Sequence, residues 1–343
     1  MVTVKAMTIS KVLVVGAGSA GLRHLHNVRE ILPNAKLFIL TRRIDLSFPG
    51  DEIEIVNSLE EARLIRPDLS IIANAASDHV RTAMLLAEEG SHLFVEKPIS
   101  VSTKEANLLV DVCREKAIKI AVGYNLRYSP SLVFFREKIL SGEIGSLLGF
   151  HCEVGQYLPS WRKNIAYRDS VSARKVSGGG VLLELSHELD YLGWIFGSWS
   201  QVVSRISKVS DLDIDVEDYV SAILGFKLEN SEREIIGTLI QDFIRRDKTR
   251  FCYVIGSEKS IRWNAIANIV EIYDVTQEIW QEIFNEGGLP VDTYKRELQA
   301  FVNGVINNTD DFVGGIESIQ ALELVEAIVQ SNDSNRVIYR DAN

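Results

Sequence analysis

Residues 11–21 have the sequence KVLVVGAGSAG, in which a short apolar run leads directly into three glycines spaced Gly-x-Gly-x-x-Gly. The apolar run predicts a buried strand, and residues 20–32 carry apolar side chains at helical spacing. Between a strand and a helix, this glycine pattern is typical of dinucleotide binding. Gly16 permits a tight turn, Gly18 lets the backbone approach a pyrophosphate, and Gly21 lets the helix pack on the strand. We therefore predict a cofactor site that includes Gly16, Gly18, Ser19, Ala20 and Gly21; the alternative is a glycine turn with a purely structural role.

The segment that follows alternates apolar runs with helical patterns. Strands are predicted at 36–40, 69–73, 92–96 and 119–123, and helices at 60–65, 79–89 and 102–116. Strands that alternate with helices form a parallel sheet with helices on its faces. We predict that residues 1–124 form a Rossmann domain that binds a dinucleotide.

After residue 125 the rhythm changes to longer strands in which apolar and polar residues alternate. A helix is predicted at about 130–141, strands at 147–157, 200–210, 217–228, 233–243 and 250–256, and helices near 181–196, 293–307 and 316–331. Consecutive alternating strands favour an open, mainly antiparallel sheet with one face covered by helices. We predict an α/β protein whose residues 125–343 form an α+β domain for substrate binding and oligomerisation. The uncovered face of the sheet predicts a homodimer or homotetramer.

The composition limits the class of protein. At about 150 residues per domain, 343 residues suggest two domains. The net charge of −10 argues against nucleic acid or an anionic membrane as a partner. No apolar run reaches the roughly 20 residues that span a bilayer, and the first ten residues contain no apolar segment typical of a secretory signal. The three cysteines have no metal-binding spacing, so we expect a reduced, cytoplasmic protein without a metal.

The end of the second predicted strand bears on the choice of cofactor. NAD-selective sites place an acid there, whereas this chain has Thr41-Arg42-Arg43. A hydroxyl and two guanidinium groups can hold a 2′-phosphate. The sequence therefore favours NADP(H) over NAD(H); an arginine pair that is merely solvated is the alternative.

Three further motifs follow the glycine turn in order: Glu96-Lys97-Pro98, GYNLRYSP at 123–130, and GGGVLLELSHELD at 178–190. Together they resemble the Gfo/Idh/MocA oxidoreductases over nearly the whole chain. Residues 153–192 are especially similar to members from bacterial surface-sugar pathways, including those for sialic-acid-like sugars. The resemblance implies a nicotinamide-dependent enzyme that acts on a sugar.

The resemblance also implies roles for single residues. Lys97 would lie at the nicotinamide and contact the reacting hydroxyl, and the Lys97–Pro98 peptide bond is expected to be cis. A cation can bind the alcohol oxygen and stabilise an alkoxide as hydride leaves. The cofactor would also be lined by Ala73, Asn74 and Glu96, while His79 is expected to begin a helix. A surface lysine is the alternative for Lys97.

The predicted helix 181–196 contains the second catalytic candidate. Its leucines have helical spacing, and on an ideal helix His187 lies nearly opposite this stripe, flanked by Glu184 and Asp190. A carboxylate neighbour fixes the tautomer of a histidine and raises its pKa, so His187 and Glu184 are predicted to be catalytic. The family has Asp four residues before this histidine, where this chain has Leu183. An exposed histidine beside solvated acids is the alternative.

Residues 156–177 form a long polar segment, and residues 161–177 contain five Lys or Arg against one Asp. In the family this stretch lines the substrate pocket. Guanidinium groups recognise carboxylate or phosphate, so we predict an anionic sugar, either a nucleotide sugar or a sugar acid. A solvated loop is the alternative. The predicted substrate residues are Tyr124, Arg127, Tyr157, Trp161, Arg162, Arg168, Lys175 and Asp190.

The sequence therefore predicts an NAD(P)-dependent sugar oxidoreductase. Two alternatives remain. One is an epimerase or hydride exchanger that reduces and reoxidises a tightly held cofactor. The other is a sensor of the same architecture without catalytic activity, which the presence of both Lys97 and His187 makes less favoured.

Overall fold

The computed structural model describes residues 8–43, 46, 52–161, 166–228, 233–287 and 291–340. The chain forms two compact units. The first comprises Met1–Asn125 and Asp292–Ile319, and the second Leu126–Val291 and Gln320–Asn343. Within the described residues, no helix is long and apolar enough to cross a membrane.

The first unit is built on a six-stranded parallel sheet in the order β3-β2-β1-β4-β5-β6. The predicted Rossmann sheet is therefore confirmed. The edge strand β3 was missed because most of its side chains are not buried, so its sequence IEIV is not a fully apolar run. The strands are β1 (Lys11–Val15), β2 (Lys36–Leu40), β3 (Ile53–Val56), β4 (Leu69–Ile72), β5 (His92–Val95) and β6 (Ile120–Val122).

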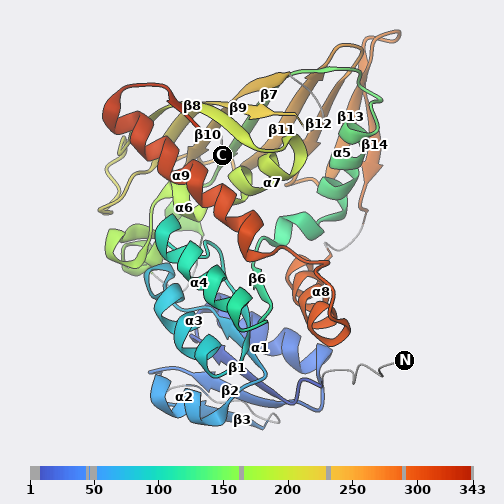
Figure 1. Ribbon diagram of the computed structural model, residues 1–343. Coiled ribbons are helices and arrows are strands. Elements are labelled where there is room, and N and C mark those ends of the chain that lie inside the picture. Colours follow the sequence, from blue (N-terminus) through green and yellow to red (C-terminus); the bar gives the residue numbers. More distant parts are fainter. Residues whose placement is uncertain are drawn as a thin grey trace. The chain divides into compact units, whose positions relative to one another are not determined.

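Helices lie on both faces of this sheet. Figure 1 shows α2, α3 and α4 on one side and α1 and α8 on the other. This division follows from right-handed crossovers, because the chain moves outward from β1 to β3 and then back toward β6. The helices are α1 (Ser19–Ile31), α2 (Leu59–Ile65), the short η1 (Ala76–Asp78), α3 (His79–Glu88), α4 (Thr103–Glu115) and α8 (Thr293–Asn307).

Helix α8 corrects one prediction. We expected residues 293–307 to cover the antiparallel sheet, but α8 packs against α1 and β5 of the first unit. Its Leu298, Phe301 and Val302 belong to the same buried cluster as Val12 and Val14 of β1. The apolar stripe of an amphipathic helix shows that one face is buried, but it does not identify the surface that covers this face.

The second unit contains a nine-stranded sheet in the order β14-β13-β12-β11-β7-β10-β9-β8-β15. All neighbouring pairs are antiparallel except β7 and β10, so the predicted open, mainly antiparallel sheet is confirmed. Strands β12 to β15 were not predicted. The strands are β7 (Leu147–Gly155), β8 (Trp199–Ser207), β9 (Tyr219–Lys227), β10 (Glu234–Asp242), β11 (Thr249–Gly256), β12 (Ser260–Asn264), β13 (Ile269–Asp274), β14 (Ile279–Asn285) and β15 (Ile338–Tyr339).

The helices of this unit pack on one face of its sheet, where α5 contacts β12 to β14 and α7 contacts β9. The predicted single helix at 181–196 is wrong: the structure has two helices with a break at residues 185–186. The segments are α5 (Pro130–Leu140), η3 (Leu158–Ser160), η4 (Tyr167–Asp169), η5 (Val171–Ala173), η6 (Lys175–Ser177), α6 (Val181–Glu184) and α7 (His187–Phe196), together with η2 (Asn125–Tyr128) and α9 (Gly315–Ser334), of which Asn125 and Gly315–Ile319 belong to the first unit.

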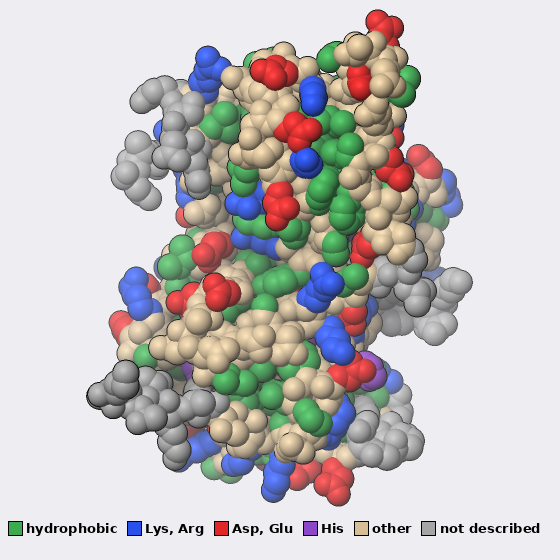
Figure 2. All heavy atoms as spheres, turned by 90° about the vertical axis from the view of Figure 1, so that its right-hand side faces the viewer, with side chains coloured by type: hydrophobic (Ala, Val, Ile, Leu, Met, Phe, Trp, Pro, Cys, Tyr) green, Lys and Arg blue, Asp and Glu red, His purple; other side chains and the backbone are tan. Residues whose placement is uncertain are grey.

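The other face of the sheet carries exposed apolar side chains, among them Val203, Ile223, Ile236 and Ile255. On the side of the molecule drawn in Figure 2, basic and acidic side chains of the described residues are interspersed with hydrophobic ones. This mixed surface differs from the single-sign field expected of a nucleic-acid-binding protein.

Candidate active site

The carboxyl ends of the strands in the first unit define one edge of the sheet. Because β1, β2, β4 and β5 are parallel, the residues that follow each of them lie at this same edge. The predicted cofactor residues all follow these strands: 16–21 after β1, 41–43 after β2, 73–74 after β4, and 96–97 after β5.

The glycine turn has the geometry that a dinucleotide requires. Gly16 has a φ of +99°, and a Cβ there would lie 2.5 Å from the carbonyl oxygen of Ala73. A Cβ at Gly21 would overlap the carbonyl oxygen of Gly16, whereas a Cβ at Gly18 would meet nothing within 4 Å. Gly18 is the N-cap of α1, and Ser19 and Ala20 begin the helix. Open space at a helix N-terminus fits a pyrophosphate.

The arginines after β2 lie close to this turn. The backbone N–H of Arg43 donates to the hydroxyl of Thr41 at 3.1 Å, and its Nη1 donates to the carbonyl oxygen of Ala17 at 3.1 Å. Arg42 is exposed. The end of β2 is thereby tied to the glycine turn, with two guanidinium groups at the position where a cofactor ribose is expected.

The turn after β4 is held by hydrogen bonds to α3 and to the loop that follows β5. Asn74 donates from its side-chain Nδ2 to the hydroxyl of Thr82 at 3.0 Å. His79 lies 2.8 Å from the carbonyl oxygen of Pro98 through Nδ1 and 3.3 Å from that of Asn74 through Nε2. Burial lowers the pKa of His79, and a neutral ring donates from one nitrogen only, so the shorter contact is the stronger candidate. His79 begins α3, as expected, and links the loops that follow β4 and β5.

The peptide bond between Lys97 and Pro98 is cis, as predicted. The carboxylate of Glu96 points to α1, where its Oε1 lies 2.7 Å from Nε2 of His24. Its Oε2 accepts from the backbone N–H of Lys97 at 3.3 Å. Burial opposes ionisation, but the His24 hydrogen bond and the charges of His24 and Lys97 outweigh it, and the pKa of Glu96 is lowered. The contact of Glu96 with the cofactor stays a prediction, as does that of Lys97.

His24 was missed by the sequence analysis, although a signal was present. It lies three residues after Gly21 on the same face of α1 as Leu25 and Val28, and it is fully buried. A histidine on the apolar face of an amphipathic helix needs a polar partner in the core. Tyr124, a predicted substrate residue, is also buried, at the end of β6.

In the second unit, the catalytic candidate His187 is the first residue of α7. We expected His187 on the face opposite the leucine stripe of one continuous helix, between Glu184 and Asp190, and the structure differs from this arrangement. His187 is only 8% exposed, and Asp190 is buried. Since the helix is broken, the ideal-helix geometry behind the prediction does not apply.

The two carboxylates have other partners. Asp190 accepts two hydrogen bonds from Arg127, at 2.9 Å from Nε and 2.7 Å from Nη2. Glu184 accepts from the hydroxyl of the buried Ser172 at 2.9 Å. The structure therefore joins two predicted substrate residues, Arg127 and Asp190, in a bidentate ion pair.

Further contacts fix the first turns of α7 to the sheet. Glu188 is fully buried, and its Oε1 lies 2.9 Å from Nε of Arg250 on β11. The hydroxyl of Tyr191 lies 3.0 Å from Sγ of Cys152 on β7. Together with the Arg127 pair, these contacts hold the helix that presents His187.

In residues 156–161 and 166–177, which the structure describes, the chain forms the short helical turns η3 to η6. The ring of Tyr157 lies 3.5 Å from the guanidinium carbon of Arg246, and Trp161 donates to the carbonyl oxygen of Gln156 at 3.1 Å. Arg168 and Lys175 are exposed. Arg162 lies outside the described residues.

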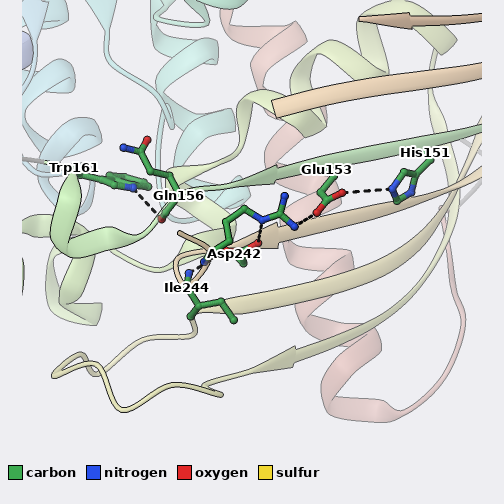
Figure 3. Close-up of polar contacts among 7 residues, drawn as sticks. His151, Glu153, Gln156, Trp161, Asp242 and Ile244 are labelled. Atoms are coloured by element: carbon green, nitrogen blue, oxygen red, sulfur yellow. Dashed lines mark hydrogen bonds and ion pairs between the residues drawn. The ribbon is translucent and has the colours of Figure 1, made fainter. Parts of the chain in front are cut away.

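Arg245 and Arg246, which follow β10, were also missed from the sequence. Arg245 donates from Nε to Asp242 at 3.1 Å and pairs with Glu153 of β7. Figure 3 shows Glu153 and Asp242 near Gln156 and Trp161. Two arginines one residue after the end of a predicted strand repeat the pattern at 42–43, which is the signal that was available.

Comparison with known proteins identifies the family. Residues 10–124 match the model of the GFO_IDH_MocA oxidoreductase family's NAD-binding Rossmann fold, and residues 136–339 match that of its C-terminal alpha/beta domain. The chain belongs to the Gfo/Idh/MocA family of oxidoreductases. The predicted resemblance, the NAD(P)-dependent oxidoreductase class and the two-part fold are therefore confirmed.

Two relatives illustrate the similarity. The glucose-6-phosphate 3-dehydrogenase of Bacillus subtilis (strain 168) is 23% identical, over 92% of this chain and 95% of the relative. The D-xylose dehydrogenase of Paenarthrobacter nicotinovorans is 24% identical, over 79% of this chain and 77% of the relative.

Two solved structures share the fold. The WlbA dehydrogenase from Bordetella pertussis, in complex with NADH and UDP-GlcNAcA, has a TM-score of 0.82 at 17% identity, covering 98% of this chain and 100% of that one. A levoglucosan dehydrogenase in complex with NADH has a TM-score of 0.82 at 19% identity, covering 96% and 98%.

Proposed function

We propose that this oxidoreductase transfers hydride between NADP(H) and a carbon of an anionic sugar that bears a hydroxyl or a ketone. The observation that carries the proposal is Lys97, which follows β5 at the same sheet edge as the glycine turn after β1. An ammonium group at that edge is suited to a reaction in which negative charge develops on oxygen.

The chemistry assigns different tasks to the two candidate residues. Lys97 binds the oxygen of the reacting carbon and stabilises the alkoxide character that develops there. His187 accepts the hydroxyl proton in oxidation and returns it in reduction, directly or through a relay. Bound NADP(H) supplies the hydride acceptor or donor.

The preference for NADP(H) is supported by the end of β2. Arg43 is held near the glycine turn by its bond to Ala17, and Arg42 is exposed beside it. Since the WlbA and levoglucosan dehydrogenase structures contain NADH, the preference rests on this chain's own arginines. We expect a lower Kd for NADPH than for NADH, measured by quenching of protein fluorescence; tighter binding of NADH would contradict it.

The anionic substrate is supported by the basic segment. Residues 161–177 contain five Lys or Arg against one Asp, within a chain of net charge −10. Arg168 is exposed, and so is Arg246, next to Tyr157. Two of the similar proteins are named with anionic sugars: glucose 6-phosphate for the Bacillus subtilis relative and UDP-GlcNAcA for the WlbA complex. Guanidinium groups recognise the phosphate and carboxylate groups of such sugars.

A sugar panel tests the function. Turnover is followed at 340 nm with both cofactors on glucose 6-phosphate and UDP-GlcNAcA as anionic sugars, and on levoglucosan and D-xylose as neutral ones. We expect the anionic sugars to be faster, and Arg168→Ala to raise KM for them roughly tenfold. Arg114→Ala on α4 serves as an exposed control with an unchanged KM.

Three outcomes oppose this proposal in different ways. Faster turnover of the neutral sugars, with an unchanged KM in Arg168→Ala, contradicts the anionic substrate. Cofactor that remains bound through purification and is reoxidised by the sugar product favours an internal hydride exchanger. Saturable sugar binding without any absorbance change favours a sensor.

The proposal extends to assembly and location. The exposed apolar side chains on the outer face of the nine-stranded sheet support pairing of two chains through this face into a homodimer or homotetramer.

The cytoplasm, where cysteines stay reduced, is the proposed location; Cys113, Cys152 and Cys252 are free and buried.

A further inference from the structure

The helix that carries His187 is interrupted just before it, although its sequence favours continuity. Leu182, Leu185 and Leu189 have helical spacing, yet α6 ends at Glu184 and α7 begins at His187. Leu185 has φ −101° and ψ 29°, which lies outside the helical region. Because the local pattern favours one helix, contacts from elsewhere must hold the break.

Gln241 of β10 makes such a contact. Its Nε2 donates to the carbonyl oxygen of Leu185 at 2.6 Å, across 56 residues of sequence. The backbone N–H of Glu188 approaches the same oxygen only at 3.5 Å. In an unbroken helix, the carbonyl oxygen of Leu185 would accept from the backbone N–H four residues later. At the break, its short hydrogen bond comes from the side chain of Gln241 instead.

The position of Gln241 in its strand is unusual. β10 buries every second side chain, including Ile235 and Leu239, and Gln241 falls on this buried face with 0% exposure. A buried amide is costly unless it is hydrogen-bonded. Leucine would satisfy the strand pattern better. Within the described residues, the side chain of Gln241 makes its hydrogen bond to Leu185 through Nε2, while its buried Oε1 has no partner there.

Two other contacts hold the segment before the break. The carboxylate of Glu217 accepts from the backbone N–H of Leu182 at 3.1 Å, and Ser172 donates to Glu184 at 2.9 Å. The three contacts hold Leu182, Glu184 and Leu185. Leu185, which Gln241 contacts, is the nearest of these to His187 in the sequence. If α6 and α7 formed one continuous helix, the register of His187 in that helix would differ from the observed one. Each residue of difference turns the side chain by about 100° around the helix axis and moves it by about 1.5 Å along the axis.

We propose that Gln241 is a positioning residue for the reaction, which fixes the start of α7 and thereby the imidazole of His187. The proposal rests on the proposed role of His187 as general acid/base. It does not require Gln241 to touch the substrate or the cofactor.

The test removes the donor and keeps the size of the side chain. Gln241→Met, measured with the panel sugar that the unaltered protein oxidises fastest, is expected to lower kcat roughly 10- to 100-fold, as a small misplacement of a catalytic group does. KM and the Kd for NADPH are expected to stay within about twofold, since binding is not altered. In a His187→Ala background, Gln241→Met should lower kcat no further.

Ser204→Ala is the matched control. Ser204 of β8 donates to the carbonyl oxygen of Ile328 in α9 at 2.6 Å, which is also a buried side-chain bond from the sheet to a helix backbone. It is expected to lower the unfolding midpoint but to leave kcat unchanged. If Gln241→Met does not fold, Gln241→Asn replaces it, because its shorter amide stays polar but does not reach Leu185.

The outcomes separate the two claims. An unchanged kcat in folded Gln241→Met, an equal loss in Ser204→Ala, or a full further loss in the His187→Ala background would overturn the positioning role. An unchanged kcat in His187→Ala itself would instead overturn the proposed function of His187.

Discussion

The bond between His24 and Glu96 links helix α1 to the residue before Lys97. The two side chains meet at 2.7 Å, His24 is fully buried, and its ring also packs edge-on against Phe94. Glu96 in turn accepts from the backbone N–H of Lys97. The proposed catalytic lysine thus extends from a backbone that is tied to the first helix of the cofactor unit.

Removing His24 is predicted to destabilise the protein strongly. His24→Ala leaves the carboxylate of Glu96, whose side chain is 13% exposed, without this partner, and breaking a buried pair from one side costs about 3–5 kcal/mol. The free energy of unfolding from urea titration measures the loss.

His26→Ala is the control, because His26 lies on the same helix with a 73% exposed side chain, 3.5 Å from Glu30. Its expected effect is below about 0.5 kcal/mol. Equal effects of the two substitutions would refute the structural role of the pair.

Motifs indicated the candidate catalytic residues, but they did not indicate the side chains that contact the neighbours of these candidates. Lys97 and His187 stand in recognisable sequence contexts. The partners of Glu96 and Leu185 lie 72 and 56 residues away in the chain, so no local spacing links them. Only the unexpected polarity of His24 and Gln241 at buried positions of their elements was visible in the sequence.

Hydrophobic periodicity located helices such as α8 correctly, but it did not indicate which part of the fold each helix packs against. Helix α8 falls on the predicted residues 293–307, yet it packs in the first unit, where Phe301 contacts the rings of Phe94 and Phe312. The break before α7 was not predicted either, because tertiary contacts outweigh the helical preference of residues 181–196 there.

Phe301→Ala tests the place of α8. Phe301 is fully buried in the core cluster that includes β1, so its truncation is predicted to cost about 3–5 kcal/mol. Hydrogen exchange should show faster exchange of the β1 and β2 amides, with little change in β11 to β13.

Leu140→Ala, at an exposed position at the end of α5, is the control and should leave both sets of amides unchanged. Faster exchange in β11 to β13 alone after Phe301→Ala would mean that α8 packs on the antiparallel sheet, as the sequence had indicated.

The nine-stranded sheet has one face covered by helices and one with exposed apolar side chains. Val203 and Ile223 are direct partners on neighbouring strands, and Ile223 is 50% exposed. Ile236, on the adjacent strand β10, is 47% exposed. A cluster of this kind on a sheet face is typical of an interface between subunits.

Ile223→Arg is predicted to convert the proposed dimer into monomers, because it places an unpaired charge in the interface. Light scattering after gel filtration measures the mass. Leu64→Arg, at an exposed position of α2, should leave the assembly unchanged. The pairing is refuted if the unaltered protein is monomeric, or if Ile223→Arg keeps the mass of the unaltered protein.

In the proposed function, Lys97 carries the hydride-transfer chemistry of an NADP(H)-dependent sugar oxidoreductase. The most direct test of this role compares the unaltered protein with Lys97→Met in the 340-nm assay, at saturating sugar and cofactor, with the Kd for NADPH measured on both. We expect Lys97→Met to lower kcat by about 10²- to 10⁴-fold while the Kd for NADPH changes little. Turnover by Lys97→Met at the rate of the unaltered protein would contradict it.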